Sequence, residues 1–146
     1  MTATPNEAAD RVAIHALLIE YGAALDRRDF DAFARLFGED GIYEAGPGGS
    51  AVGAETGPMM RHVFATGPNA TNTPNFHLFF NELIWFDAPD RARSTSLCLF
   101  MTPDRETKRP TVAVSAHYED ELVRKDGEWL FARRTLKPIL NAPPLV

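Results

Sequence analysis

Cysteine is almost absent from this sequence, since Cys98 is the only one among 146 residues. A single cysteine cannot form an internal disulfide, which favours a protein of the reducing cytoplasm over a secreted one. No apolar run reaches the roughly 18 residues of a membrane-spanning helix. The first ten residues lack the basic start and apolar stretch of a signal peptide. We therefore expect a soluble, cytoplasmic protein.

Positive charge is also scarce. The chain has 15 Lys and Arg residues against 20 Asp and Glu, a net charge of −5, and no basic patch with interleaved aromatics, so we expect no nucleic-acid partner. No pair of histidines has close ligand spacing, and there is no cysteine cluster or phosphate-binding glycine loop. We therefore expect neither a metal nor a cofactor.

What the chain does have is the composition of an ordinary globular domain, with 45% hydrophobic and 24% charged residues. Its length suits one domain spanning residues 1–146. Apolar residues at helical spacing predict a helix over residues 6–27. A second helix is expected directly after Asp29, a suitable N-cap, and a third over residues 54–65.

The second half of the chain changes to extended patterns. Asp126-Gly127 is a strong hairpin signal between the last two strands. Helices followed by hairpin-linked strands indicate an α+β fold, in which three N-terminal helices cover one face of a curved antiparallel sheet and the resulting cone encloses a pocket. Strands are expected over residues 42–44, 76–86, 92–101, 111–124 and 129–137, and irregular chain over 46–49, 67–74 and 141–146.

Two polar residues of the first helix stand out. On a helical wheel Tyr21 and Asp26 are separated by about 140° and flank one apolar arc, which has the width of a core-facing stripe. A carboxylate beside buried surface needs a partner or a polar cavity. Asp26 is therefore either a solvated residue at the helix end or part of a pocket, and Tyr21 either a core tyrosine or a pocket donor.

Two histidines lie on predicted strands. His77 has apolar neighbours and shares a face with Phe79, Asn81 and Leu83 if the strand alternates regularly. A carboxylate partner would make a buried imidazole a stronger base. His117 alternates with polar neighbours, so its face either meets solvent or lines a polar cavity.

The opening segment from Tyr21 to Tyr43, YGAALDRRDFDAFARLFGEDGIY, and the closing segment from Tyr118 to Arg134, YEDELVRKDGEWLFARR, resemble those of the SnoaL-like, NTF2-like superfamily. The resemblance covers nearly the whole chain and implies the cone-shaped α+β fold. Within the superfamily the likeness is greatest to a lyase branch that contains scytalone dehydratase, bile acid 7α-dehydratase and hexachlorocyclohexane dehydrochlorinase.

The resemblance assigns roles to particular residues. The lyases pair an aspartate at the end of the first helix with a histidine on the sheet, which match Asp26 and His77. Their helix tyrosine matches Tyr21, and their arginine on the final strand matches Arg134, so these four residues are the expected catalytic group. A second strand histidine of scytalone dehydratase has no clear match. We expect substrate contacts from Tyr43, His117, Phe79, Trp85 and Met101.

The resemblance leaves three classes of function open. The first is a cofactor-independent lyase, a dehydratase or dehydrohalogenase, acting on a small, hydrophobic, cyclic molecule. The second is a binding module without catalysis, such as the small subunit of a ring-hydroxylating oxygenase. The third is a polyketide cyclase or an isomerase, although the general-base aspartate of ketosteroid isomerase falls at about Ala45 here. The resemblance also implies a homo-oligomer, either a trimer or a dimer.

Overall fold

The computed structural model describes residues 5–66 and 74–139. Its helices precede most of its strands, as the α+β expectation requires. In chain order the elements are α1 (Pro5–Asp26), α2 (Phe30–Arg35), β1 (Ile42–Glu44), the 3-10 turn η1 (Gly46–Gly48), β2 (Ser50–Val52), the 3-10 turn η2 (Gly53–Glu55), α3 (Thr56–Thr66), β3 (Phe76–Ala88), β4 (Arg91–Pro103), β5 (Pro110–Lys125) and β6 (Glu128–Pro138).

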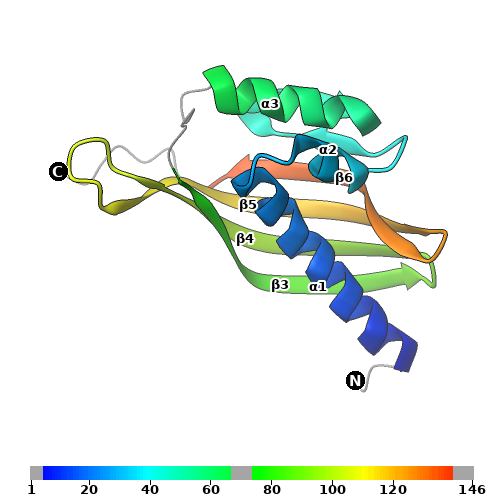
Figure 1. The fold of residues 1–146 in the computed structure, drawn as a ribbon. Coiled ribbons are helices and arrows are strands. Elements are labelled where there is room, and N and C mark those ends of the chain that lie inside the picture. The colour runs from blue at the N-terminus through cyan, green and yellow to red at the C-terminus, as the bar shows by residue number, and fades with distance from the viewer. Residues whose placement is uncertain (1–4, 67–73, 140–146) are drawn as a thin grey trace.

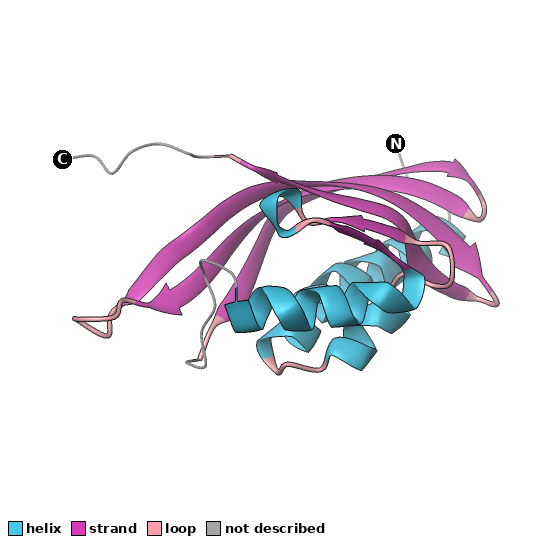
Figure 2. Ribbon diagram, turned by 90° about the horizontal axis from the view of Figure 1, so that it is seen from above, coloured by secondary structure: helices cyan, strands magenta, loops and turns pink. Residues whose placement is uncertain are grey.

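The strands form one six-stranded sheet in the order β2-β1-β6-β5-β4-β3. Strands β3 to β6 are joined by consecutive antiparallel hairpins. The sheet arches over the helices, which all lie on its concave side (Figure 2). Helix α1 runs along that side against β3 and β6, and α2 packs on α3 (Figure 1). The concave face and the helices together form the open cone that the sequence predicts.

Local chemistry explains where several elements begin and end. The Asp29 side chain accepts a hydrogen bond from the Ala32 backbone N–H at 2.9 Å, which caps α2 as expected. Asp126 and Gly127 both adopt positive φ, 51° and 83°, as the tight turn between β5 and β6 requires. The ends of the predicted helices and long strands differ from the observed ones by one or two residues.

Two features of the sheet differ from the expectation. A short strand that was not predicted, β2, pairs with β1, and β1 pairs with β6 in parallel, so the sheet is not purely antiparallel. The strand over residues 42–44 was predicted and is β1, whereas β2 has only three residues, too few for a periodic pattern to reveal it. The expected loop over residues 67–74 and tail over 141–146 lie outside the described residues, apart from Pro74.

A bulge in β3 changes which side chains face the helices. Its register with β4 shifts between Phe80 and Leu83, and Asn81 has a φ of 52°. Before the bulge His77 and Phe79 face inward, whereas after it Ile84 and Phe86 do. The extra residue reverses the alternation along the strand. Leu83 and Trp85 consequently lie on the outer face, although regular alternation places them beside His77.

Candidate functional site

A cavity of about 570 Å³ lies between the concave face of the sheet and the helices. Most of its wall is apolar, and the polar groups come from a few tyrosines, two histidines, a serine, a threonine and a cysteine. The lining residues are Tyr21, Leu25, Tyr43, Ala45, Pro47, Gly48, Met60, His62, Val63, Phe64, Thr66, His77, Cys98, Phe100, Ala113, Val114, Ser115, Ala116, Tyr118, Leu136 and Pro138.

The cavity wall carries no Asp, Glu, Lys or Arg side chain from the part of the chain that the structure describes. The remaining segments, residues 1–4, 67–73 and 140–146, contain none of these residue types in the sequence. The cavity therefore offers a ligand hydrogen bonds and apolar contacts, but no charged carboxylate, ammonium or guanidinium partner.

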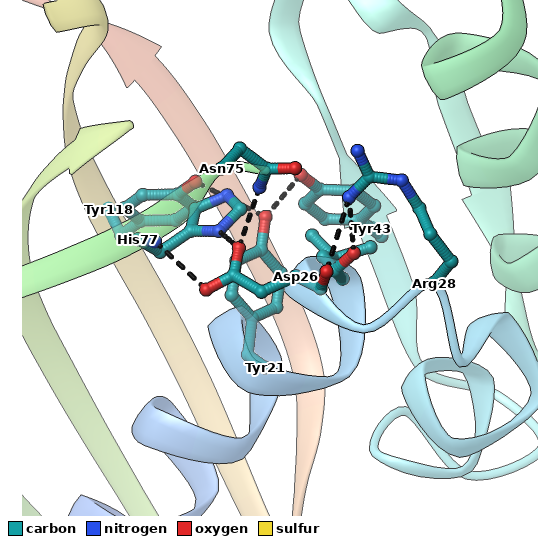
Figure 3. A network of polar contacts seen from close by, with 8 residues as sticks. Tyr21, Asp26, Arg28, Tyr43, Asn75, His77 and Tyr118 are labelled. Carbon is teal, nitrogen blue, oxygen red and sulfur yellow. Dashed lines mark hydrogen bonds and ion pairs between the residues drawn. The ribbon is translucent and has the colours of Figure 1, made fainter. Parts of the chain in front are cut away.

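Asp26 and His77 meet at the wall of this cavity, where the end of α1 lies against the start of β3 (Figure 3). The imidazole Nδ1 is 2.6 Å from Asp26 Oδ1, and the backbone N–H of His77 donates to Oδ2 at 3.0 Å. A carboxylate without a proton can only accept, so Nδ1 carries the hydrogen in this pairing. The other ring nitrogen, Nε2, has no hydrogen-bond partner among the described residues, and the ring lines the cavity.

Asn75 completes the surroundings of this carboxylate. Its Nδ2 donates to Asp26 Oδ1 at 2.8 Å, and the residue is buried. Asp26 thus accepts three hydrogen bonds, all from the first residues at the start of β3. The helix end and the strand are held together by one side chain, which fixes the imidazole relative to the cavity.

The three tyrosines of the chain form a second polar group on the same wall. The Tyr21 hydroxyl lies 2.5 Å from the Tyr43 hydroxyl and 3.2 Å from that of Tyr118, and all three side chains line the cavity. Burial raises the pKa of each well above the ordinary value, so all three are neutral phenols at physiological pH. Three hydroxyl hydrogens and two mutual hydrogen bonds leave one hydrogen for a ligand.

Arg134 lies behind the tyrosines and not in the cavity wall. It is fully buried, and its Nη1 contacts both carboxylate oxygens of Asp120 at 3.0 and 3.1 Å. Asp120 also accepts a hydrogen bond from Ser94 at 2.9 Å. Burial raises the pKa of Asp120, while Arg134 and Ser94 lower it. The structure therefore places Arg134, which was expected in the catalytic group, behind the rings of Tyr21 and Tyr118 and outside the cavity wall.

The remaining candidates divide between the inner and outer faces of the sheet. Tyr43 lines the cavity. Phe79 does not, and its ring packs against the Tyr21 ring with the two centres 5.9 Å apart. His117 lies between the inward-facing Ala116 and Tyr118, so it points outward, 3.9 Å from Glu119. The sequence left open whether the face of His117 meets solvent or lines a polar cavity, and the structure places it on the outer face of the sheet.

Trp85 and Met101 also lie outside the cavity. Trp85 is 43% exposed beyond the β3 bulge and stacks with Arg93. Met101 follows a second bulge, between Phe100 and Met101 in the pairing of β4 with β5, and Phe100 takes the inward position. The structure therefore places His117, Trp85 and Met101, from which substrate contacts were expected, outside the cavity wall. Regular alternation put Trp85 on the inner face, whereas no face was predicted for Met101 and the face of His117 was left open.

The model of the SnoaL-like domain matches residues 6–135, which is most of the chain. This protein belongs to the SnoaL-like domain family. The structure of Rv3472, a Mycobacterium tuberculosis protein of unknown function, is similar to it at 26% identity, with a TM-score of 0.75, and the match covers 92% of this chain and 76% of that one.

Two structures from Novosphingobium aromaticivorans are also similar to this SnoaL-like chain. One, provisionally named an aromatic ring hydroxylase, is 26% identical with a TM-score of 0.75 and coverages of 94% and 93%. The other, provisionally named a scytalone dehydratase, is 23% identical with a TM-score of 0.77 and coverages of 94% and 89%, and it supports the fold alone.

Sequence reasoning missed several residues of this SnoaL-like site. Tyr118 and Asp120 are inward-facing neighbours on β5, and alternation with the outward His117 could have identified both. Asn75 precedes the strand and left no periodic signal. Cys98 lines the cavity, and burial raises the pKa of its thiol to about 12. His62 reaches the cavity from α3, although its position on a helix makes it look ordinary.

No group of three or more histidine, cysteine, aspartate or glutamate side chains could hold a metal ion within residues 5–66 and 74–139. Over the same ranges, no helix is long and apolar enough to cross a membrane.

Proposed function

We propose that this SnoaL-like protein is a cofactor-independent lyase, which eliminates water or a halide from a small, uncharged, hydrophobic and cyclic substrate. The observation that carries the proposal is the Asp26–His77 contact of 2.6 Å at the cavity wall, with Nε2 left for a ligand. A buried imidazole whose Nδ1–H is held by a carboxylate has its basic nitrogen directed elsewhere, which is the arrangement of a general base.

The reaction that uses both polar groups of the wall is a β-elimination. His77 Nε2 removes a proton from the carbon next to a carbonyl, and the free tyrosine hydroxyl hydrogen donates to the carbonyl oxygen as negative charge develops on it. The electron pair of the broken C–H bond forms the carbon–carbon double bond as the β-substituent leaves. A departing hydroxide takes the proton from the His77 imidazolium and becomes water, whereas a halide leaves as the anion and the imidazolium returns its proton to water.

The character of the cavity supports the class of substrate. Its apolar wall suits a hydrophobic molecule, and its volume of about 570 Å³ lies within the usual range for small-molecule sites. Since no cationic side chain lines it, a free carboxylate or phosphate would lose its hydration without gaining an ionic partner. We therefore expect neutral ketones with a β-hydroxyl or β-halogen group to be favoured over the corresponding acids.

The test is turnover of neutral cyclic β-hydroxyketones and β-chloroketones, followed by the absorbance of the conjugated product. Replacing His77 with Gln should lower kcat by about 10²- to 10⁴-fold. His15→Gln is the matched control, because His15 also pairs with a carboxylate, Glu82 at 2.8 Å, but on the exposed surface. Equal turnover in His77→Gln and wild type would remove His77 from the mechanism.

A second candidate function rests on the outer face of the sheet. Large apolar side chains along the edge strand β3 and on β5 are exposed there: Phe76, Leu78, Phe80, Leu83, Trp85 and Val112. Such a surface is typical of a subunit interface. A homo-oligomer, trimer or dimer, would cover it in the lyase, whereas the subunit of a larger oxygenase would use it to bind a different chain. Absence of elimination across the whole substrate panel would favour this non-catalytic role.

The proposed location is the cytoplasm. This proposal rests on the single, buried cysteine, because one cysteine cannot form a disulfide within the chain.

A further inference from the structure

Arg134 occupies an unusual place for a charged residue. Its guanidinium carbon lies 4.0 Å from the centre of the Tyr118 ring and 4.2 Å from that of Tyr21, with Phe131 at 4.6 Å and Phe79 at 5.5 Å. The side chain is fully buried. A cation is thus enclosed by aromatic rings, and two of those rings belong to the phenols that line the cavity.

The hydrogen bonding of Arg134 is one-sided. Nη1 pairs with Asp120, whereas Nε and Nη2 are buried and have no hydrogen-bond partner among the described residues. The aromatic rings surround this part of the side chain, so the N–H groups can interact only with the π faces of those rings. The ion pair is therefore an oriented dipole: its negative end is held by Ser94, and its positive end lies against Tyr21 and Tyr118.

We propose that Arg134 is a positioning residue that acts through the ring faces of Tyr21 and Tyr118, and so strengthens their hydroxyl groups as hydrogen-bond donors to a ligand in the cavity. This inference deepens the proposed function, on which its catalytic consequence rests. Arg134 touches neither the ligand nor the phenol oxygens. It stabilises electron density that moves from a bound oxyanion into the tyrosine hydrogen-bond chain, because a cation over a ring favours negative charge on that ring.

The other groups around the tyrosines make Arg134 the one cation that can act in this way. The other titratable groups near the tyrosines are Asp26 on α1, His77 on β3, Cys98 on β4 and Asp120 on β5. In the described part of the chain, no second Lys or Arg lies against the three rings. Burial raises the pKa of Tyr21 and of Tyr118, and the charge of Arg134 acts in the opposite direction on both. The cation thus offsets part of the rise in pKa that burial causes in these two phenols.

The composition of the chain allows a direct test, because its only three tyrosines are Tyr21, Tyr43 and Tyr118. Growth on 3,5-difluorotyrosine, whose phenol is more acidic than that of tyrosine, labels these three positions and no others, and 19F NMR follows their ionisation as the pH rises. The test variant is the pair Arg134→Met with Asp120→Asn, which removes both charges at similar volume and leaves Ser94 an acceptor.

We expect at least one resonance to titrate about 1 to 3 pH units higher in the paired variant than in wild type, the usual effect of losing a nearby opposite charge. Asp120→Asn alone keeps the cation and removes its counter-charge, so its resonances should titrate lower than in wild type. Phe79→Leu changes the packing on the same rings without changing charge and should leave the titrations in place. Arg134→Lys keeps the charge, so its resonances should titrate close to those of wild type.

The inference would be overturned if the paired variant titrates at the same pH as wild type. If the paired variant does not fold, the same outcome in Asp120→Asn would overturn it. Resonances that stay fixed in wild type up to the pH of unfolding would also count against it, since burial would then outweigh the cation. These measurements need no substrate, so they succeed or fail independently of the lyase. Given elimination activity, the paired variant should lower kcat at least 10-fold with little change in KM, and an unchanged kcat would overturn the catalytic consequence alone.

Discussion

Asp26 receives two hydrogen bonds from the same residue, His77, which lies 51 positions further along the chain. The ring Nδ1 contacts Oδ1 at 2.6 Å, and the backbone N–H contacts Oδ2 at 3.0 Å. Ring and backbone of His77 are therefore oriented by a single carboxylate. The position of the proposed base depends on how the end of α1 meets the start of β3, and variants at this junction test the proposal most directly.

Replacing Asp26 with Asn should lower the turnover of an eliminated substrate by about 10²- to 10⁴-fold, because the amide no longer holds Nδ1–H with a charged acceptor. Binding of a neutral product should change much less, since Asp26 does not line the cavity. Steady-state kinetics separate the two effects. The control is Asp31→Asn, an exposed aspartate in the first turn of α2, which should keep full activity. Full activity in Asp26→Asn would contradict the proposed base.

Gly22 permits the close contact between α1 and β3. A Cβ atom at this position would lie 2.8 Å from the Cβ of His77 and 3.0 Å from Cε2 of Phe79. In a helix interior Gly→Ala normally stabilises by about 1 kcal/mol. Here we expect Gly22→Ala to destabilise the fold by about 1–3 kcal/mol, since the strand backbone must move, and to reduce turnover as His77 shifts. Urea unfolding measures the first effect, and a gain in stability would show that the contact is loose.

The sequence was sufficient for the order and extent of α1, α3 and the four long strands, because each extends over more than ten residues. It was insufficient for the faces of β3. Asn81, at a φ of 52°, lies where β3 gains one residue. Asn is depleted in strands and tolerates positive φ, but one Asn within a strand pattern does not establish that a bulge is present. Every side chain after it is reversed, so Trp85 was assigned to the cavity when it lies outside.

The candidate site, like the fold, could be predicted from the sequence only in part. The pairing of Asp26 with His77 could be anticipated from the family resemblance, since each residue lies in a recognisable segment. The burial of Arg134 beneath two tyrosines could not, because it depends on the pairing of two strands, β5 and β6, which places Tyr118 and Asp120 beside Arg134. Strand pairing is a long-range property, which periodicity within each strand does not contain.

Alkaline titration tests the burial of the tyrosines. The pKa of each is raised well above 10 in the folded protein by burial, so the unfolded chain loses three protons near pH 10 that the folded chain retains. Their contribution to stability is complete below pH 10 and is lost as the pH rises towards the folded values, at about 4 kcal/mol per pH unit for three groups. In the folded protein, absorbance of tyrosinate should therefore rise only well above pH 10. Tyrosinate that forms near pH 10 while circular dichroism is unchanged would contradict the burial, and Tyr118→Phe should reduce the dependence of stability on pH to two protons.

The outer face of the sheet predicts an effect on assembly. Leu83 is 57% exposed next to Trp85 on β3. If this face is a subunit interface, Leu83→Lys places a charge in it and should convert an oligomer into monomers in multi-angle light scattering. The control Val12→Lys alters a still more exposed apolar residue on α1, away from the sheet, and should leave the mass unchanged. A monomeric wild type would contradict the homo-oligomer and leave the surface to a different partner chain.

The Arg134–Asp120 pair should contribute less to stability than breaking it suggests. Both side chains are fully buried, so Asp120→Asn leaves a guanidinium without its counter-charge and should cost about 3–5 kcal/mol. Arg134→Met combined with Asp120→Asn removes both desolvated charges and should unfold within about 2 kcal/mol of wild type. Urea midpoints at constant m-value give the comparison. If the paired variant is less stable than wild type by more than about 2 kcal/mol, the pair is a net stabilising contact, and its retention needs no explanation from the tyrosines. If the paired variant is as stable as wild type or more so, the buried charges add no net stability, as expected of groups kept for their effect on the adjoining phenols.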